Sequence, residues 1–84
     1  MIHTDYFYTQ LNLTDGTPIM LDIYNYREDA ENHFRAMTDR NILQDSFVGL
    51  TNIPIEEFDG ISLIRVHQKY GRQVGQECIA RKTI

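Results

Sequence analysis

The chain has 84 residues, of which 42% are hydrophobic and 24% are charged, and it contains one cysteine. This length accommodates a single core, and the composition is that of a globular protein, which excludes wholesale disorder. One cysteine excludes an internal disulfide framework. The sequence has neither an apolar run of the roughly 20 residues that span a bilayer nor a secretion signal at its start. We therefore expect one domain over residues 1–84, a cytoplasmic location and no membrane partner.

The sign of the charge changes along the chain. Residues 1–60 hold eleven carboxylates and three arginines, a net charge of −8, whereas residues 61–84 hold five basic residues and one glutamate, a net charge of +4. An uneven charge distribution steers and orients partners. The sequence therefore predicts a bipolar electric field, with the basic pole on the last segment of the chain.

Residues 4–24 are expected to form a β-hairpin. Two β-prone runs, 6–13 and 18–24, flank Asp15-Gly16, and Asp-Gly between apolar runs is a strong hairpin signal because glycine accepts a positive φ. If Gly16 is the left-handed residue of a three-residue loop, the expected cross-strand pairs are Leu11–Ile19, Thr9–Leu21 and Phe7–Ile23. Since side chains alternate along a strand, the opposite face then carries Tyr6, Tyr8, Met20, Asp22 and Tyr24.

Residues 26–38 are expected to form the main helix. Asn25 is a suitable N-cap, and Glu28 three residues later completes an arrangement like a capping box. The apolar stripe of this segment is narrow, which is typical of a helix that covers one face of a sheet. Glu31 and Arg35 have the spacing and order of a favourable ion pair.

Residues 39–60 give weaker signals. A short strand is expected at 46–50. Residues 54–58 are expected to form one helical turn, with Pro54 at its first position, where the missing N–H costs nothing. Ile55 and Phe58 would anchor this turn to the core.

Residues 61–70 and 74–83 are expected to form a second hairpin around the turn 71–73. A two-residue turn at Gly71-Arg72 is the alternative. In the preferred register, His67 faces Glu77, and Cys78 lies on an inward face as a small buried residue. The chain is thus expected to be an α+β domain, built as β-hairpin, helix, short irregular segment and β-hairpin, with four or five mainly antiparallel strands and one helix on one face.

Metal, cofactor and catalytic signatures are missing from the sequence. His3, His33, His67 and Cys78 are the candidate soft ligands, and their spacing matches no metal motif. Cys78 has no flanking helix start or glycine-rich turn that would activate its thiol. We therefore expect no metal site, no cofactor and no catalytic residue.

The basic end of the chain supplies the alternative function. A set of cationic or titratable residues could contact phosphates: Arg65, His67, Lys69, Arg72, Arg81 and Lys82. Within it, His67 and Glu77 near Arg65 could act as acid and base in a small ribonuclease. A solvated cross-strand ion pair is the plainer interpretation. The chain as a whole is acidic, so nucleic acid is disfavoured as a partner.

The acidic end and the tyrosine-rich face supply the main hypothesis. The acidic clusters are Glu28, Asp29 and Glu31, and Glu56, Glu57 and Asp59. They fit a solvated surface or an acidic patch that docks on a basic protein. They also fit a mimic of nucleic acid, as used by some small acidic proteins of phages and mobile elements, and this third interpretation rests only on an analogy with that class of proteins. The tyrosine-rich face would supply the anchors, Tyr6, Tyr8, Met20 and Tyr24. We therefore expect a non-enzymatic protein-binding or regulatory module, whose partner is another protein of a nucleic-acid-handling complex or a second copy in a homodimer.

Overall fold

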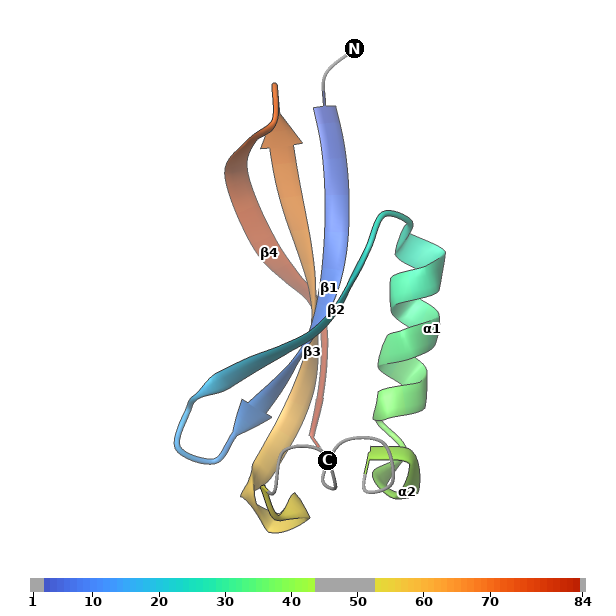
Figure 1. The fold of residues 1–84 in the computed structure, drawn as a ribbon, viewed down its shortest axis with the longest axis vertical. Coiled ribbons are helices and arrows are strands. Elements are labelled where there is room, and N and C mark those ends of the chain that lie inside the picture. The colour runs from blue at the N-terminus through green and yellow to red at the C-terminus, as the bar shows by residue number, and fades with distance from the viewer. Residues whose placement is uncertain (1–2, 44–52, 84) are drawn as a thin grey trace.

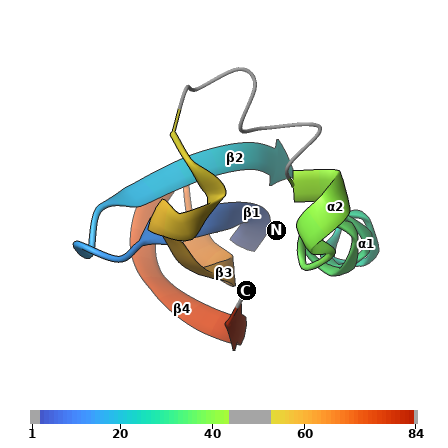
Figure 2. The same ribbon diagram turned by 90° about the horizontal axis from the view of Figure 1, so that it is seen from below.

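The computed structural model of the chain describes residues 3–43 and 53–83. Its elements are β1 (His3–Leu13), β2 (Pro18–Tyr24), α1 (Arg27–Met37), α2 (Arg40–Leu43), the 3-10 turn η2 (Ile55–Glu57), β3 (Phe58–Lys69) and β4 (Arg72–Thr83). The four strands form one antiparallel open sheet in the order β2-β1-β3-β4 (Figure 1). Figure 2 shows α1 and α2 together on one side of this sheet. The expected α+β class and the arrangement of helix on sheet are confirmed.

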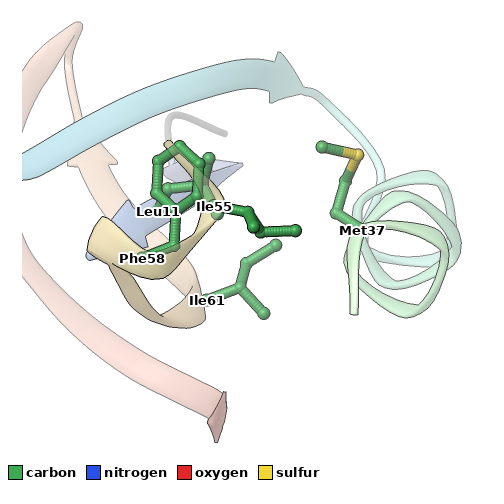
Figure 3. Close-up of a cluster of buried hydrophobic side chains, with 5 residues drawn as sticks. All are labelled: Leu11, Met37, Ile55, Phe58 and Ile61. Carbon is green, nitrogen blue, oxygen red and sulfur yellow. The ribbon is translucent and has the colours of Figure 1, made fainter. Parts of the chain in front are cut away.

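The main core lies between α1 and the sheet. Leu11 of β1 and Ile61 of β3 are fully buried, and Met37 of α1 packs on them. Figure 3 shows Met37 pointing from the helix toward the sheet residues of this cluster. Ile55 and Phe58 are buried in the same cluster, so the expected anchors of the short helical turn are confirmed. The strand expected at 46–50 lies outside the described residues.

The first hairpin has the expected turn but a different register beyond it. Gly16 has a φ of +90°, and the Leu13 amide bonds the Thr17 carbonyl at 2.9 Å, as a three-residue loop requires. Leu11 faces Ile19 as predicted. The predicted pairing of Phe7 with Ile23 is wrong, because a β-bulge lies between Tyr8 and Gln10 and brings Tyr24 opposite Phe7. The alternating pattern of a strand carries no sign of an inserted residue.

The second hairpin turns one residue earlier than expected. Tyr70 and Gly71 form the two-residue turn, with φ of +54° and +76°, and Lys69 faces Arg72. Two positive φ values define the type I′ turn that best matches the twist of paired strands. Both predicted turns, 71–73 and Gly71-Arg72, are therefore wrong, because tyrosine is disfavoured at a positive φ and gave no signal of this turn.

The start of α1 also differs from the expectation. The helix begins at Arg27, and its N-cap is Tyr26, which makes no side-chain capping bond, so the predicted cap at Asn25 is wrong. The ion pair on the helix is Arg27–Glu31, at 3.3 Å, in place of the expected pair of Glu31 with Arg35. Arg35 instead donates a hydrogen bond to Asn32.

One buried polar contact fixes α1 against the sheet. The Thr9 side chain on β1 is 0% exposed, and its hydroxyl lies 2.9 Å from Nδ1 of His33. Nε2 of the same ring lies 3.5 Å from Oδ2 of Asp22 on β2. The centroid of the Tyr24 ring lies 5.4 Å from the centroid of the His33 ring. A hydroxyl in a core needs a hydrogen-bond partner, and His33 supplies it.

Both edge strands of the sheet are interrupted by bulges. β2 carries one bulge, where Leu21 and Asp22 together lie opposite Thr9, and β4 carries two, where Val74 and Ile79 have no partner in β3. A bulge twists an edge away from pairing with another strand. Among the described residues, none of the helices has the length and apolar character needed to cross a membrane.

Candidate functional site

The face of the sheet opposite α1 is the first candidate site, and we call it the open face. Alternation along the paired strands places on it Tyr6, Tyr8, Gln10, Asn12, Met20, Ile23, Ser62, Ile64, Val66, Gln76, Cys78 and Arg81. Within the strands that the structure describes, Arg81 is the only charged residue of this set. It lies at one end of the sheet, where it pairs with Asp59 at 3.4 Å. The open face is therefore almost uncharged, in a protein in which a quarter of the residues are charged.

The centre of the open face is closed by its own side chains. Val66 is 1% exposed and Tyr8 is 8% exposed, and both pack with Ile64 and the partly buried Tyr6. The side chain of Gln76 on β4 acts on the Tyr8 hydroxyl from across the intervening strand β3. Burial raises the pKa of the Tyr8 hydroxyl above its ordinary value. Tyr8 therefore supports the sheet and offers little free surface to a partner.

A chain of hydrogen bonds covers the other half of the open face. The Gln10 amide donates to Asn12 at 2.7 Å, and the Asn12 amide donates to the Ser62 hydroxyl at 2.9 Å. None of the described residues has a buried side-chain nitrogen or oxygen without a hydrogen-bond partner. These hydrogen bonds thus link Gln10, Asn12 and Ser62 across β1 and β3.

The exposed apolar part of the open face lies on β2. Met20 is 53% exposed and Ile23 is 58% exposed. The sequence predicted Met20 here, but it placed Tyr24 on this face, which is wrong. Because of the bulge, Tyr24 turns to the helix side, where it packs with Phe7 and His33, and Ile23 takes its place. Ile23 was missed because a regular strand would have buried it.

A compact charged cluster on the other face is the second candidate site. Asp5, Arg65, His67 and Glu77 come from β1, β3 and β4. Arg65 donates to Oδ2 of Asp5 from Nε at 2.8 Å and from Nη2 at 2.5 Å, and its guanidinium lies 6.0 Å from the Phe7 ring. These bonds lower the pKa of the Asp5 carboxyl, and the charges of Arg65 and His67 act in the same direction against the effect of burial.

His67 bridges two carboxylates within this cluster. Its Nδ1 lies 3.3 Å from Oδ1 of Asp5, and its Nε2 lies 3.3 Å from Oε1 of Glu77. The predicted neighbourhood of His67, Glu77 and Arg65 therefore exists, although Arg65 is the residue opposite Glu77, and His67 faces Gly75. The sequence missed Asp5, because finding it requires the pairing of β1 with β3. A phosphate would have to displace these carboxylates before it could reach Arg65 or His67.

The remaining basic residues do not gather into one surface. Lys69 and Arg72 flank the turn of the second hairpin, whereas Arg81 and Lys82 lie near the C-terminus, at the opposite end of the long axis (Figure 1). The molecule is 43 Å long, and Arg81 is already paired with Asp59. The predicted basic residues therefore do not gather at one end of the molecule, because a hairpin as long as the molecule carries its two ends to opposite poles, and the bipolar field stays a prediction.

The predicted acidic anchors are also divided between two places. Glu28 and Asp29 are exposed at the start of α1, where Glu31 pairs with Arg27. The second acidic cluster, Glu56, Glu57 and Asp59, is exposed around η2 at the lower end of the view in Figure 1. Neither cluster borders the centre of the open face.

Cys78 is exposed on the open face, opposite Ile64, so its predicted burial is wrong. Its thiol lies 3.3 Å from the Ala80 carbonyl oxygen. Ile64 and Val66 of the second hairpin lie on the same face of the sheet as Tyr6 and Tyr8. The helices α1 and α2 cover the opposite face (Figure 2).

The described residues contain no group of three or more histidine, cysteine, aspartate or glutamate side chains that could hold a metal ion. The chain matches no protein-family model, no curated protein and no solved structure. A functional interpretation therefore rests on the two candidate sites themselves.

Proposed function

We propose that the chain is a small non-enzymatic protein-binding module whose contact surface is the open face of its sheet. The observation that carries this proposal is the lack of charge on that face beside the exposed Met20 and Ile23. The centres of protein interfaces are depleted of charged residues and enriched in tyrosine and methionine. A sheet covered on one side only also presents the broad surface that such a contact needs.

Site-specific photo-crosslinking tests the proposal in the cell that makes the protein. A photoreactive amino acid replaces Ile23 on the open face or, as the matched control, Ile42 on α2, which is also an exposed isoleucine. We expect discrete crosslinked protein products from position 23 and none of them from position 42. The same products from both positions, or none from position 23, would refute the proposed surface.

The alternative, contact with RNA through the second hairpin, has weaker support. Arg65, His67 and Arg81 all have carboxylate partners within 4 Å, which compete with phosphate. If RNA were the ligand, binding would fall steeply with salt, and glutamine at Arg65 and Lys69 would abolish it. Titration of a labelled single-stranded RNA at two salt concentrations decides between the two functions.

A further inference from the structure

We propose that the occupant of the open face is a second copy of the chain, so that two sheets pack face to face in a dimer. This inference rests on the proposed function, because it names the partner of the same surface. The open face of each sheet would then be covered by the sheet of the other copy, as two sheets cover each other in a β-sandwich.

Charge favours this occupant. Each copy has a net charge of −4, so two copies that met through α1 or η2 would bring like-charged carboxylates together. On the open face, Arg81 is the only charged residue among the described strand residues, and it lies at one end with Asp59 as its partner. This is the surface on which two acidic copies can meet without repulsion between their carboxylates.

The hydrogen bonds of the open face favour a partner with the same uncharged character. The side chains of Gln10, Asn12 and Ser62 bond one another. Each of these three side chains already has a partner within the sheet, so each has less hydrogen bonding to water to lose when a second face covers it. An identical face can therefore cover them, and its Met20 and Ile23 add the exposed apolar area.

The edges of the sheet exclude the other common mode of self-association. Pairing of β2 or β4 with its copy would extend the sheet, but β4 carries two bulges and β2 begins with Pro18. Bulges and proline are the devices that block pairing at an edge. Association through the face remains.

The outline of the face can be compared with the size of a specific interface. The strands have 11, 7, 12 and 12 residues. At about 3.3 Å per residue and about 4.8 Å between strands, they span roughly 670 Å². Specific interfaces bury about 600–1,000 Å² on each partner. The outline of the face lies at the lower end of this range, and its central residues Tyr8, Ile64 and Val66 are already buried within one copy, so the contact would be made mainly by the surrounding exposed residues such as Met20 and Ile23.

Sedimentation equilibrium, combined with alkylation of Cys78, tests the dimer. We expect the purified chain to reach twice its 9.9 kDa mass as its concentration rises. Alkylation of Cys78, which is exposed on the open face of a single chain, should slow over the same range. Ile23→Asp should raise the dimer dissociation constant at least about a hundredfold, because it places an unpaired carboxylate in the contact, and should restore fast alkylation. Ile42→Asp, the matched control, should leave both unchanged.

Several results would overturn the dimer. A single-chain mass at every concentration refutes it, as does a dimer in which Cys78 reacts as fast as in the monomer. Circular dichroism checks that Ile23→Asp is folded, and Met20→Lys repeats the test at the other exposed residue. If the protein is monomeric while position 23 crosslinks a different protein, the dimer fails and the proposed function stands. If position 23 gives no crosslink, both fail.

Discussion

Replacement of His33 by leucine is expected to lower stability by leaving the Thr9 hydroxyl without its partner. Thr9 is fully buried, and Nδ1 of His33 lies 2.9 Å from its oxygen. In the tautomer with the proton on Nε2, the hydroxyl donates to Nδ1, and Nε2–H faces Asp22. Loss of the partner of a buried polar group costs about 1–3 kcal/mol. The expected decrease in the free energy of unfolding for His33→Leu is therefore about 2 kcal/mol.

The size of the domain converts this free energy into a melting temperature. Unfolding entropy is about 2.1 cal/mol/K per residue, or about 0.18 kcal/mol/K for a chain of this length. A loss of about 2 kcal/mol should lower Tm by about 11 °C. Calorimetry and urea unfolding, monitored by circular dichroism, measure the two quantities independently.

A double-mutant cycle separates the hydrogen bond from other effects of the substitution. Thr9→Val removes the hydroxyl, so the double variant Thr9→Val/His33→Leu has no unpaired group in this position. We expect it to be more stable than the sum of the single losses predicts, by about 1 kcal/mol. If the two losses add within about 0.3 kcal/mol, or if His33→Leu melts with the unsubstituted protein, the contact does not hold the helix on the sheet.

Three further substitutions test other features of the sheet. Asp5→Asn should reduce stability near neutral pH, and the difference from the unsubstituted protein should vanish in acid. Arg65 lowers the folded-state pKa of Asp5 below its ordinary 3.8. The stability that the Asp5 carboxylate contributes is therefore complete above that value and is lost as pH falls through the folded-state pKa. Urea unfolding across pH 3–7 would contradict this if the difference were constant. Gly60→Ala should cost about 1–3 kcal/mol, because its Cβ would lie 2.7 Å from the Lys82 carbonyl oxygen, and an unchanged urea midpoint would refute that close approach. Tyr70→Asn should raise stability by about 0.5–1 kcal/mol, because asparagine tolerates the positive φ, and a lower Tm would show that the ring makes a compensating contact.

Local signals in the sequence predicted the elements of this fold well. The Asp15-Gly16 turn, the narrow apolar stripe of the helix and the anchors Ile55 and Phe58 each report on a few neighbouring residues. These signals depend on backbone conformation and periodicity, which short segments carry by themselves. The α+β class followed from their order along the chain.

The bulges and the turn at Tyr70-Gly71 explain most of what the sequence did not predict. One bulge exchanges Tyr24 for Ile23 on the open face. In the second hairpin, the turn at Tyr70-Gly71 together with the one bulge at Val74 sets Arg65 opposite Glu77. A bulge inserts one residue into a strand, and the alternation of side chains in the sequence gives no sign of where that residue lies. Only part of the charged cluster was predicted. His67 and Glu77 lie in one hairpin, so their proximity could be predicted from the local sequence, whereas Asp5 contacts Arg65 across a separation of 60 residues in the chain.

The position of β1 inside the sheet has a consequence for synthesis of the chain. β1 and β2 are made first, yet one side of β1 stays unpaired until β3 is complete, about 45 residues later. At about 5–20 residues per second, that wait lasts roughly 2–9 s on the ribosome. During it, the nascent hairpin presents an unpaired strand edge together with Phe7 and Leu11, which only α1 and β3 later bury. The first third of this protein therefore leaves the ribosome as a segment prone to mispair, and the extent of mispairing depends on how quickly the last third is synthesised.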